Sequence, residues 1–118
     1  DCDSPYMLLV AQVREGKRTI PSVTHVDNSA RLQTVRRADS PLYYDLIAEF
    51  EKLTGVPLVI NTSFNVRGEP IVCTPHDAYL CFMRTNMDHL VLGHYLLAKP
   101  DQPPLREDTD WRKLYELD

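Results

Sequence analysis

The sequence predicts an α/β fold in which helices pack on a twisted, mixed sheet. Two stretches repeat apolar residues at three- and four-residue steps, as amphipathic helices do, at residues 41–53 and 75–85. Four short segments suit strands, at residues 5–13, 32–36, 56–60 and 89–97, and all but the second are apolar runs. Because one helix separates the second and third segments, we expect a right-handed crossover between these two strands.

The first strand is predicted from the apolar run PYMLLVAQV, which ends before the turn-like residues 14–17. Neither a helical nor a strand period persists from Lys17 to Ala30. Residues 25–29 are polar and are predicted as a loop that leads into the second strand, Leu32–Arg36.

The first helix carries signals at both ends. Asp39 or Ser40 can cap it, and Pro41 takes the first helical position, where a missing N–H costs no hydrogen bond. Gly55 follows the last apolar residue and can adopt the positive φ that ends many helices. We expect the apolar stripe of this helix to pack on the sheet, and it comprises Leu42, Tyr43, Leu46, Ile47, Phe50 and Leu53.

The second half of the chain repeats the strand and helix pattern. Residues 56–60, VPLVI, suit a central strand covered on both faces. Thr74 is predicted to cap the second helix, with Asp77 where a capping box usually has Glu. Residues 89–97 are predicted as one last strand. The inner face of the second helix is predicted to hold Ala78, Tyr79, Cys81, Phe82 and Thr85.

Composition and charge exclude several classes of protein. The formal net charge of −4 argues against a nucleic-acid partner. The three cysteines are odd in number and contain no CxxC pair, so we expect neither a disulfide framework nor a zinc site. We expect no metal ligands in the chain, because its histidines also lack metal-ligand spacing. No apolar run is long enough to span a bilayer, so we expect no membrane association and a cytoplasmic location.

The composition changes beyond Lys99. We divide the chain into a domain at residues 4–99 and an extended C-terminal tail at residues 100–118, which is rich in proline and charge. A short helix is predicted within the tail, and its apolar residues are Trp111, Leu114, Tyr115 and Leu117.

The loop at residues 61–70, NTSFNVRGEP, carries the strongest chemical signal. It is predicted to leave the carboxyl end of a buried strand, where open α/β sheets bind their ligands. Arg67 can clamp a phosphate through two parallel N–H groups, and Gly68 lets backbone approach a ligand closely. Four further side chains can donate hydrogen bonds to phosphate or carbonyl oxygens, namely Asn61, Thr62, Ser63 and Asn65. The alternative is a polar turn that satisfies its own backbone.

A second polar cluster precedes and enters the second predicted strand. Arg31 and Gln33 alternate with Leu32 and project from one face, and His25 lies just upstream. A second arginine aimed at the same space as Arg67 suits a polyphosphate. The alternative is a solvated strand face with a surface histidine.

These segments resemble one known family. The strings LVINTSFNVRGEPIVCTP (residues 58–75), THVDNSARLQTV (24–35) and SPYML (4–8) are similar to the C-terminal domain of the NodU/CmcH family of O-carbamoyltransferases. The resemblance implies an enzyme of two domains. An N-terminal domain transfers the carbamoyl group, and a C-terminal YrdC-like α/β domain binds ATP, with Mg²⁺, and carbamoyl phosphate to form carbamoyladenylate.

The resemblance also implies roles for the residues. Asn61, Ser63, Asn65 and Arg67 match the loop that faces the nucleotide and carbamoyl phosphate, while His25, Arg31 and Gln33 match the opposing wall. We expect Arg67, Arg31, Asn61 and Ser63 to act in catalysis. All four, together with Thr62, Asn65, His25 and Gln33, are expected to bind the ligands.

The family's basic segment upstream of the SPYM match is not in this chain. We therefore expect an incomplete domain that is inactive alone, with the missing N-terminal transferase domain as its partner in cis and a homodimer left open. Two other functions stay as alternatives. One is a non-catalytic docking module. The other is a YrdC-like RNA-modification protein that forms a threonylcarbamoyl adenylate, which the acidic charge and the loop sequence disfavour.

Overall fold

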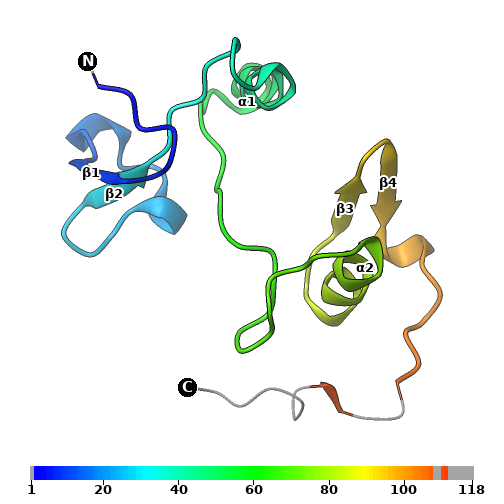
Figure 1. The fold of residues 1–118 in the computed structure, drawn as a ribbon. Helices are drawn as coiled ribbons and strands as arrows, with labels where there is room; N and C mark the ends of the chain where they lie inside the picture. Colours follow the sequence, from blue (N-terminus) through cyan, green and yellow to red (C-terminus); the bar gives the residue numbers. More distant parts are fainter. Residues whose placement is uncertain (1, 108–109, 112–118) are drawn as a thin grey trace. The chain divides into compact units, whose positions relative to one another are not determined.

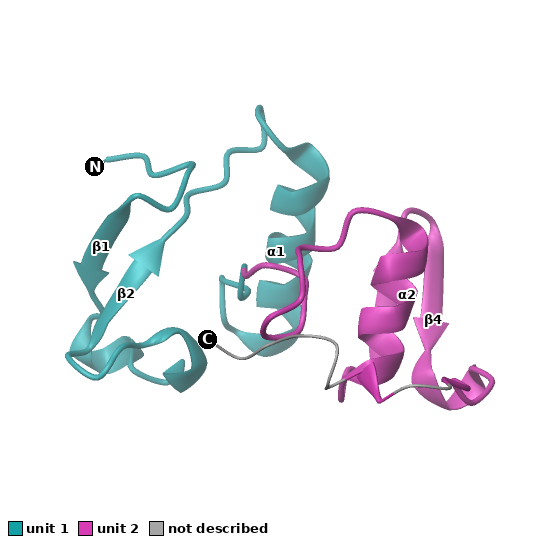
Figure 2. Ribbon diagram, turned by 60° about the horizontal axis from the view of Figure 1, so that its bottom comes forward, with its two compact units in different colours: residues 1–61 teal, residues 62–118 magenta. Residues whose placement is uncertain are grey.

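The chain belongs to the α/β class, and its described residues form two helices and two small antiparallel sheets (Figure 1). The computed structural model describes residues 2–107 and 110–111. The predicted helical residues Leu114, Tyr115 and Leu117 lie outside this range. The described chain divides into two compact units, residues 1–61 and 62–118, which Figure 2 shows in different colours. The predicted boundary at residue 99 stays a prediction.

The first sheet belongs to unit 1. Strand β1 (Leu9–Gln12) pairs antiparallel with β2 (Ser29–Leu32), and two short 3-10 turns, η1 (Glu15–Lys17) and η2 (Pro21–Val23), lie in the connection. The first predicted strand, residues 5–13, is confirmed only at Leu9–Gln12, because residues 5–7 form a turn in which Met7 has φ 56°. The second strand covers Ser29–Leu32 instead of the predicted residues 32–36, because Ser29 and Ala30 already pair with β1. Beyond the ladder, the backbone N–H of Thr34 donates to the carbonyl oxygen of Ser4.

Helix α1 (Pro41–Thr54) confirms the predicted ends. Pro41 takes the first position, and Gly55 adopts φ 73° just past the end. Ser40 is the residue before the helix, but its side chain makes none of the predicted capping hydrogen bonds. The predicted packing of α1 on a sheet is wrong for the described residues. Most of the apolar stripe stays exposed, with 83% of Leu42 and 85% of Leu53 accessible, while Tyr43 and Ile47 are half-buried. Helical periodicity therefore fixed the element but not what covers it.

The predicted central strand at residues 56–60 is also wrong. These residues form no ladder in the part of the chain that the structure describes, and Ile60 is exposed. The predicted crossover and the predicted single mixed sheet are wrong as well, since the four strands of the described chain form two separate antiparallel pairs. An apolar run becomes a strand only where another strand offers its N–H and C=O groups.

Unit 2 holds helix α2 (Pro75–Arg84) and the hairpin of β3 (His89–Leu92) and β4 (Tyr95–Ala98). Residues 89–97 are thus a hairpin rather than one strand. Gly93 opens the two-residue loop at φ 60°, a conformation that favours glycine. Ala78, Phe82 and Leu90 form a small core, and the prediction of the inner face of α2 holds for its buried residues.

Both ends of α2 are capped. The hydroxyl of Thr74 accepts from the backbone N–H of Asp77 at 3.2 Å, and the Asp77 carboxylate accepts from the N–H of Thr74 at 2.9 Å, which completes the predicted capping box. At the other end Lys99 donates its ammonium to the carbonyl oxygens of Phe82 and Thr85. These oxygens are among the carbonyls that a helix leaves unpaired at its C-terminus.

The capping box makes unit 2 sensitive to acid. Hydrogen bonds from Thr74 lower the pKa of Asp77 below its ordinary value of 3.8. The stabilising effect of the folded carboxylate is therefore present above that value and lost as the pH falls through the lower, folded-state pKa. We expect Asp77→Ala to unfold more easily at pH 7 and to lose less stability than the parent between pH 4 and 2. Urea titrations of both proteins at pH 7, pH 4 and pH 2 measure these differences. Equal loss of stability in the two proteins between pH 4 and 2 would contradict the prediction.

The three cysteines differ in exposure. Cys81 is fully buried in α2, and desolvation raises the pKa of its thiol, whereas Cys2 and Cys73 are exposed. We expect iodoacetamide under native conditions to alkylate Cys2 and Cys73 while sparing Cys81. In urea all three should react. Peptide mass spectrometry measures the label at each site, and rapid native labelling of Cys81 would refute its place in the core.

No helix in the described ranges has the length and apolar character needed to cross a membrane.

Candidate functional site

A polar junction in unit 1 joins three segments that are distant in sequence. Asn61 donates its amide to Gln33 Oε1 at 2.5 Å, and Gln33 donates in turn to the carbonyl oxygen of Pro5 at 3.1 Å. The Asn61 amide nitrogen also lies 3.7 Å from Met7 Sδ. The predicted site residues Asn61 and Gln33 are therefore in direct contact.

The N-terminal segment is fixed to the end of β2 by Ser4. This buried residue donates its hydroxyl to the carbonyl of Leu32 at 2.9 Å and its backbone N–H to Thr34 Oγ1 at 2.9 Å. Three residues on, Met7 adopts φ 56°, a conformation that costs energy for a residue with a side chain. Such strain persists where surrounding contacts over-determine the backbone, and it is commonest at ligand sites.

His25 takes part in a second network, with Asp27 and Ser29. Its Nδ1 lies 2.8 Å from the hydroxyl oxygen of Ser29, and that hydroxyl donates to Asp27 Oδ1 at 2.7 Å. The backbone N–H of Ser29 donates to the same oxygen at 3.0 Å. Hydrogen bonds from Ser29, followed by a smaller attraction to His25, lower the pKa of Asp27.

Arg31 shares a face of β2 with Ser29, because side chains alternate along a strand. Val10 and Gln12 of β1 lie opposite these two residues. The same alternation, continued one residue past the strand, brings Gln33 to that face. Unit 1 therefore gathers four of the predicted site residues along one strand and its ends, His25, Arg31, Gln33 and Asn61.

The remaining predicted residues lie on the loop of unit 2. The N–H of Glu69 donates to the carbonyl of Val66 at 3.0 Å, which closes a tight turn with Arg67 and Gly68 at its centre. Gly68 has φ 82°, so this turn requires its glycine. Arg67 is exposed at the turn, and Thr62 and Ser63 are exposed upstream of it.

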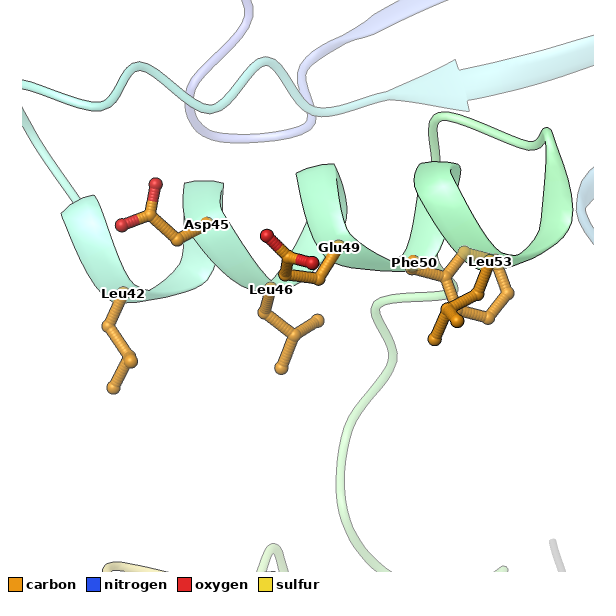
Figure 3. A pocket seen from close by; sticks show the side chains of 6 residues that line it. All are labelled: Leu42, Asp45, Leu46, Glu49, Phe50 and Leu53. Atoms are coloured by element: carbon orange, nitrogen blue, oxygen red, sulfur yellow. The ribbon is translucent and has the colours of Figure 1, made fainter.

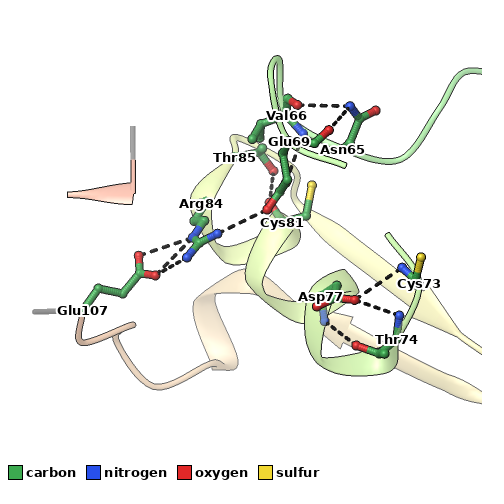
Figure 4. A network of polar contacts seen from close by, with 10 residues as sticks. All are labelled: Asn65, Val66, Glu69, Cys73, Thr74, Asp77, Cys81, Arg84, Thr85 and Glu107. Carbon is green, nitrogen blue, oxygen red and sulfur yellow. Dashed lines mark hydrogen bonds and ion pairs between the residues drawn. The ribbon is translucent and has the colours of Figure 1, made fainter. Parts of the chain in front are cut away.

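Asn65 braces this turn from inside. Its amide nitrogen donates to the carbonyls of Val66 at 3.1 Å and Glu69 at 2.8 Å (Figure 4). Both hydrogens of the amide are thus used within the loop, while its side-chain oxygen stays able to accept. Its predicted role in ligand binding stays a prediction, whereas its structural role is evident.

Sequence reasoning missed the ion network that anchors the loop. Arg84, at the end of α2, lies 3.3 Å from Glu69 Oε1 through Nη1 and 2.5 Å from Glu107 Oε1 through Nη2 (Figure 4). Only 8% of the Arg84 side chain and 12% of the Glu69 side chain are exposed. Arg84 also lies over the ring of Trp111, 5.5 Å from its centroid. The one available signal was a basic residue in the last turn of a helix, which ordinarily indicates only a helix-dipole contact.

A shallow groove runs along α1 in unit 1 (Figure 3). Leu42, Leu46, Phe50 and Leu53 line it, with Asp45 and Glu49 at one side. None of the predicted site residues contributes to it. Across the described ranges, no group of three or more His, Cys, Asp or Glu side chains is placed to hold a metal ion.

Arg31 belongs to unit 1 and Arg67 to unit 2, so their predicted convergence on one ligand stays a prediction. The structure shows one polar surface in each unit, and each surface contains segments that resemble the family.

One family match spans the residues of both surfaces. The carbamoyltransferase C-terminus family matches residues 1–99, which include His25, Arg31, Gln33 and the whole 61–70 loop. The chain belongs to this family.

Named relatives agree with that membership. The nodulation protein NolNO of Sinorhizobium fredii is 47% identical over 93% of this chain, and the 3'-hydroxymethylcephem-O-carbamoyltransferase of Amycolatopsis lactamdurans is 38% identical over 79%. Protein sll1178 of Synechocystis is 50% identical over the full chain. The chain spans 23%, 16% and 18% of the lengths of sll1178, NolNO and the cephem enzyme.

Proposed function

We propose that this carbamoyltransferase C-terminus domain forms part of an ATP-dependent O-carbamoyltransferase and belongs to the YrdC-like pocket that makes carbamoyladenylate. The observation that carries the proposal is the braced turn at residues 66–69. A loop that only reverses the chain needs no buried ion pair, yet here Arg84 holds Glu69 while the neighbouring Arg67 is exposed. Rigid support beneath an exposed cation is the arrangement that anion binding requires.

The chemistry proposed has two steps. Water first releases phosphate from carbamoyl phosphate, which leaves carbamate. A carbamate oxygen then forms a bond to the α-phosphorus of ATP, and the bond from that phosphorus to the oxygen that bridges to the β-phosphate breaks. Carbamoyladenylate and pyrophosphate result. Mg²⁺ enters with the ATP phosphates and neutralises part of their charge.

Residues of this chain act by position and charge. Arg67 and Arg31 stabilise the negative charge that gathers on the leaving pyrophosphate, because guanidinium groups pair with phosphate oxygens through two N–H groups. The Ser63 and Thr62 hydroxyls donate to carbamoyl or phosphate oxygens. The Asn61 amide joins them by exchanging its contact with Met7 Sδ for the ligand. No side-chain nucleophile is needed, since positioning and electrostatics carry this class of reaction.

The relatives support a hydroxyl acceptor. One of them is named as a carbamoyltransferase that acts on the hydroxymethyl oxygen of a cephem. We place acceptor recognition outside this chain, in the remainder of a longer protein. We also propose that this protein acts in the cytoplasm.

The test is isotope exchange between pyrophosphate and ATP in the longer protein that contains this chain. We expect exchange that depends on carbamoyl phosphate and is not supported by threonine with bicarbonate. Exchange with threonine instead would favour the RNA-modification alternative. No exchange with either, together with no ATP binding by calorimetry, would leave the docking-module alternative.

A further inference from the structure

The network of Asp27, Ser29 and His25 fixes where the proton of the imidazole resides. Ser29 has one hydroxyl hydrogen, and an ionised Asp27 can only accept. The lowered pKa of Asp27 keeps this carboxylate ionised at neutral pH. The Ser29 hydrogen therefore goes to Asp27 Oδ1, at 2.7 Å. The 2.8 Å contact between Ser29 Oγ and His25 Nδ1 must then be donated by the ring.

This assignment determines what His25 offers to a ligand. With the hydrogen on Nδ1, the neutral ring has its lone pair on Nε2, which can only accept a hydrogen bond. In the described part of the chain Nε2 has no hydrogen-bond partner, and His25 is exposed. A phosphate oxygen is itself an acceptor, so it matches this nitrogen poorly. An N–H donor matches it well.

The charge beside His25 points the same way. Asp27 is exposed and ionised close to the ring, so it repels phosphate and attracts a group with partly positive hydrogens. The nearest predicted phosphate ligand of this unit, Arg31, lies on the strand beyond Ser29. A ligand with an amide N–H₂ at one end and a phosphate at the other fits this order of groups.

We propose that His25, positioned by Ser29 and Asp27, accepts a hydrogen bond from the amino group of the carbamoyl moiety and so selects carbamoyl phosphate over other acyl phosphates. This inference rests on the proposed function. The family resemblance implies only that His25 is one member of a wall that faces nucleotide and phosphate. The proposal assigns His25 to the carbamoyl amino group instead.

Ligand protection of His25 tests the proposal in the longer protein that contains this chain. Diethyl pyrocarbonate modifies the unprotonated nitrogen of exposed histidines, and peptide mass spectrometry gives the rate at each one. His76 and His94 are exposed in the same chain and serve as internal references. Carbamoyl phosphate and acetyl phosphate are the two probes, because they differ by an amino group in place of a methyl group.

We expect carbamoyl phosphate to slow modification of His25 about fivefold more than acetyl phosphate at equal concentration, the factor that one net hydrogen bond gives. Ser29→Ala should abolish this difference, since the ring can then adopt either tautomer. Ser4→Ala is the matched control, because it removes an equally buried hydroxyl that does not touch His25. Asp27→Ala, at an exposed position, removes the acceptor of the Ser29 hydrogen, so it should weaken the difference even if Ser29→Ala fails to fold.

The other outcomes distinguish failure of this inference from failure of the proposed function. Equal protection by both probes would overturn the inference, because His25 would then recognise phosphate, and would leave the proposed function standing. Absence of protection in a preparation that catalyses carbamoyl-phosphate-dependent exchange would do the same. Absence of both protection and exchange would overturn the two together.

Discussion

Arg67→Ala in the longer protein should reduce carbamoyl-phosphate-dependent exchange of pyrophosphate into ATP by about a hundredfold to a thousandfold. Removal of one charged or polar donor that stabilises transition-state charge costs about 3 to 4 kcal/mol. The loss should appear in kcat more than in KM, since the charge on pyrophosphate develops only as the bond breaks. Arg67 is exposed on a turn that Asn65 braces through the carbonyl of Glu69. Circular dichroism and urea unfolding of the variant check that the fold is kept.

Two variants sharpen this test. Arg67→Lys keeps the charge but loses the paired N–H geometry, so its exchange rate should fall between those of the parent and Arg67→Ala. Arg106→Ala removes another exposed arginine of unit 2 and should leave exchange unchanged. If Arg67→Ala exchanges as fast as Arg106→Ala, the assignment of Arg67 is wrong.

Arg84→Met should destabilise unit 2 by about 3 to 5 kcal/mol. Removal of one partner from a buried ion pair leaves the other charge without compensation, and this is the cost seen in such cases. Here Glu69 and Glu107 would both lose the guanidinium, although Met fills much of its volume. Urea unfolding followed by the fluorescence of Trp111, the single tryptophan, measures the change within this unit.

The exposed pair of Arg37 and Asp45 provides the control. Its nitrogen and oxygen lie 3.1 Å apart, but 69% and 47% of the two side chains are accessible, so Arg37→Met should cost less than about 1 kcal/mol. In Arg84→Met, Glu69→Gln with Glu107→Gln should recover much of the lost stability, because the stranded charges are then gone. A loss as small as that of Arg37→Met would show that the Arg84 network contributes little.

The Arg84 network also links stability to function. Glu69 belongs to the turn that carries Arg67, so loss of Arg84 should loosen that turn as well as unit 2. We expect exchange to fall in Arg84→Met even at temperatures where the protein stays folded. The sequence patterns predicted the loop and Arg67 as functional, but they did not identify Arg84 as the residue that supports the loop.

The predicted strand at residues 56–60 shows why part of the fold escaped prediction. An apolar run states that a segment avoids water, and a strand additionally needs a neighbour with free backbone groups. No such neighbour pairs with these residues in the described chain. The prediction of one strand at residues 89–97 is wrong in a smaller way, since both halves are strands but Gly93 opens the turn between them.

By itself the sequence determined both helices and their ends, the capping box of Thr74 and Asp77, and the segments that define the family. These features depend on residues within a few positions of one another, so local spacing encodes them. Only tertiary structure decided that Asn61 meets Gln33, 28 residues away, and that Arg84 meets Glu69 and Glu107, 15 and 23 residues away. Contacts at such separations depend on how the chain folds back, which no local pattern of polarity specifies.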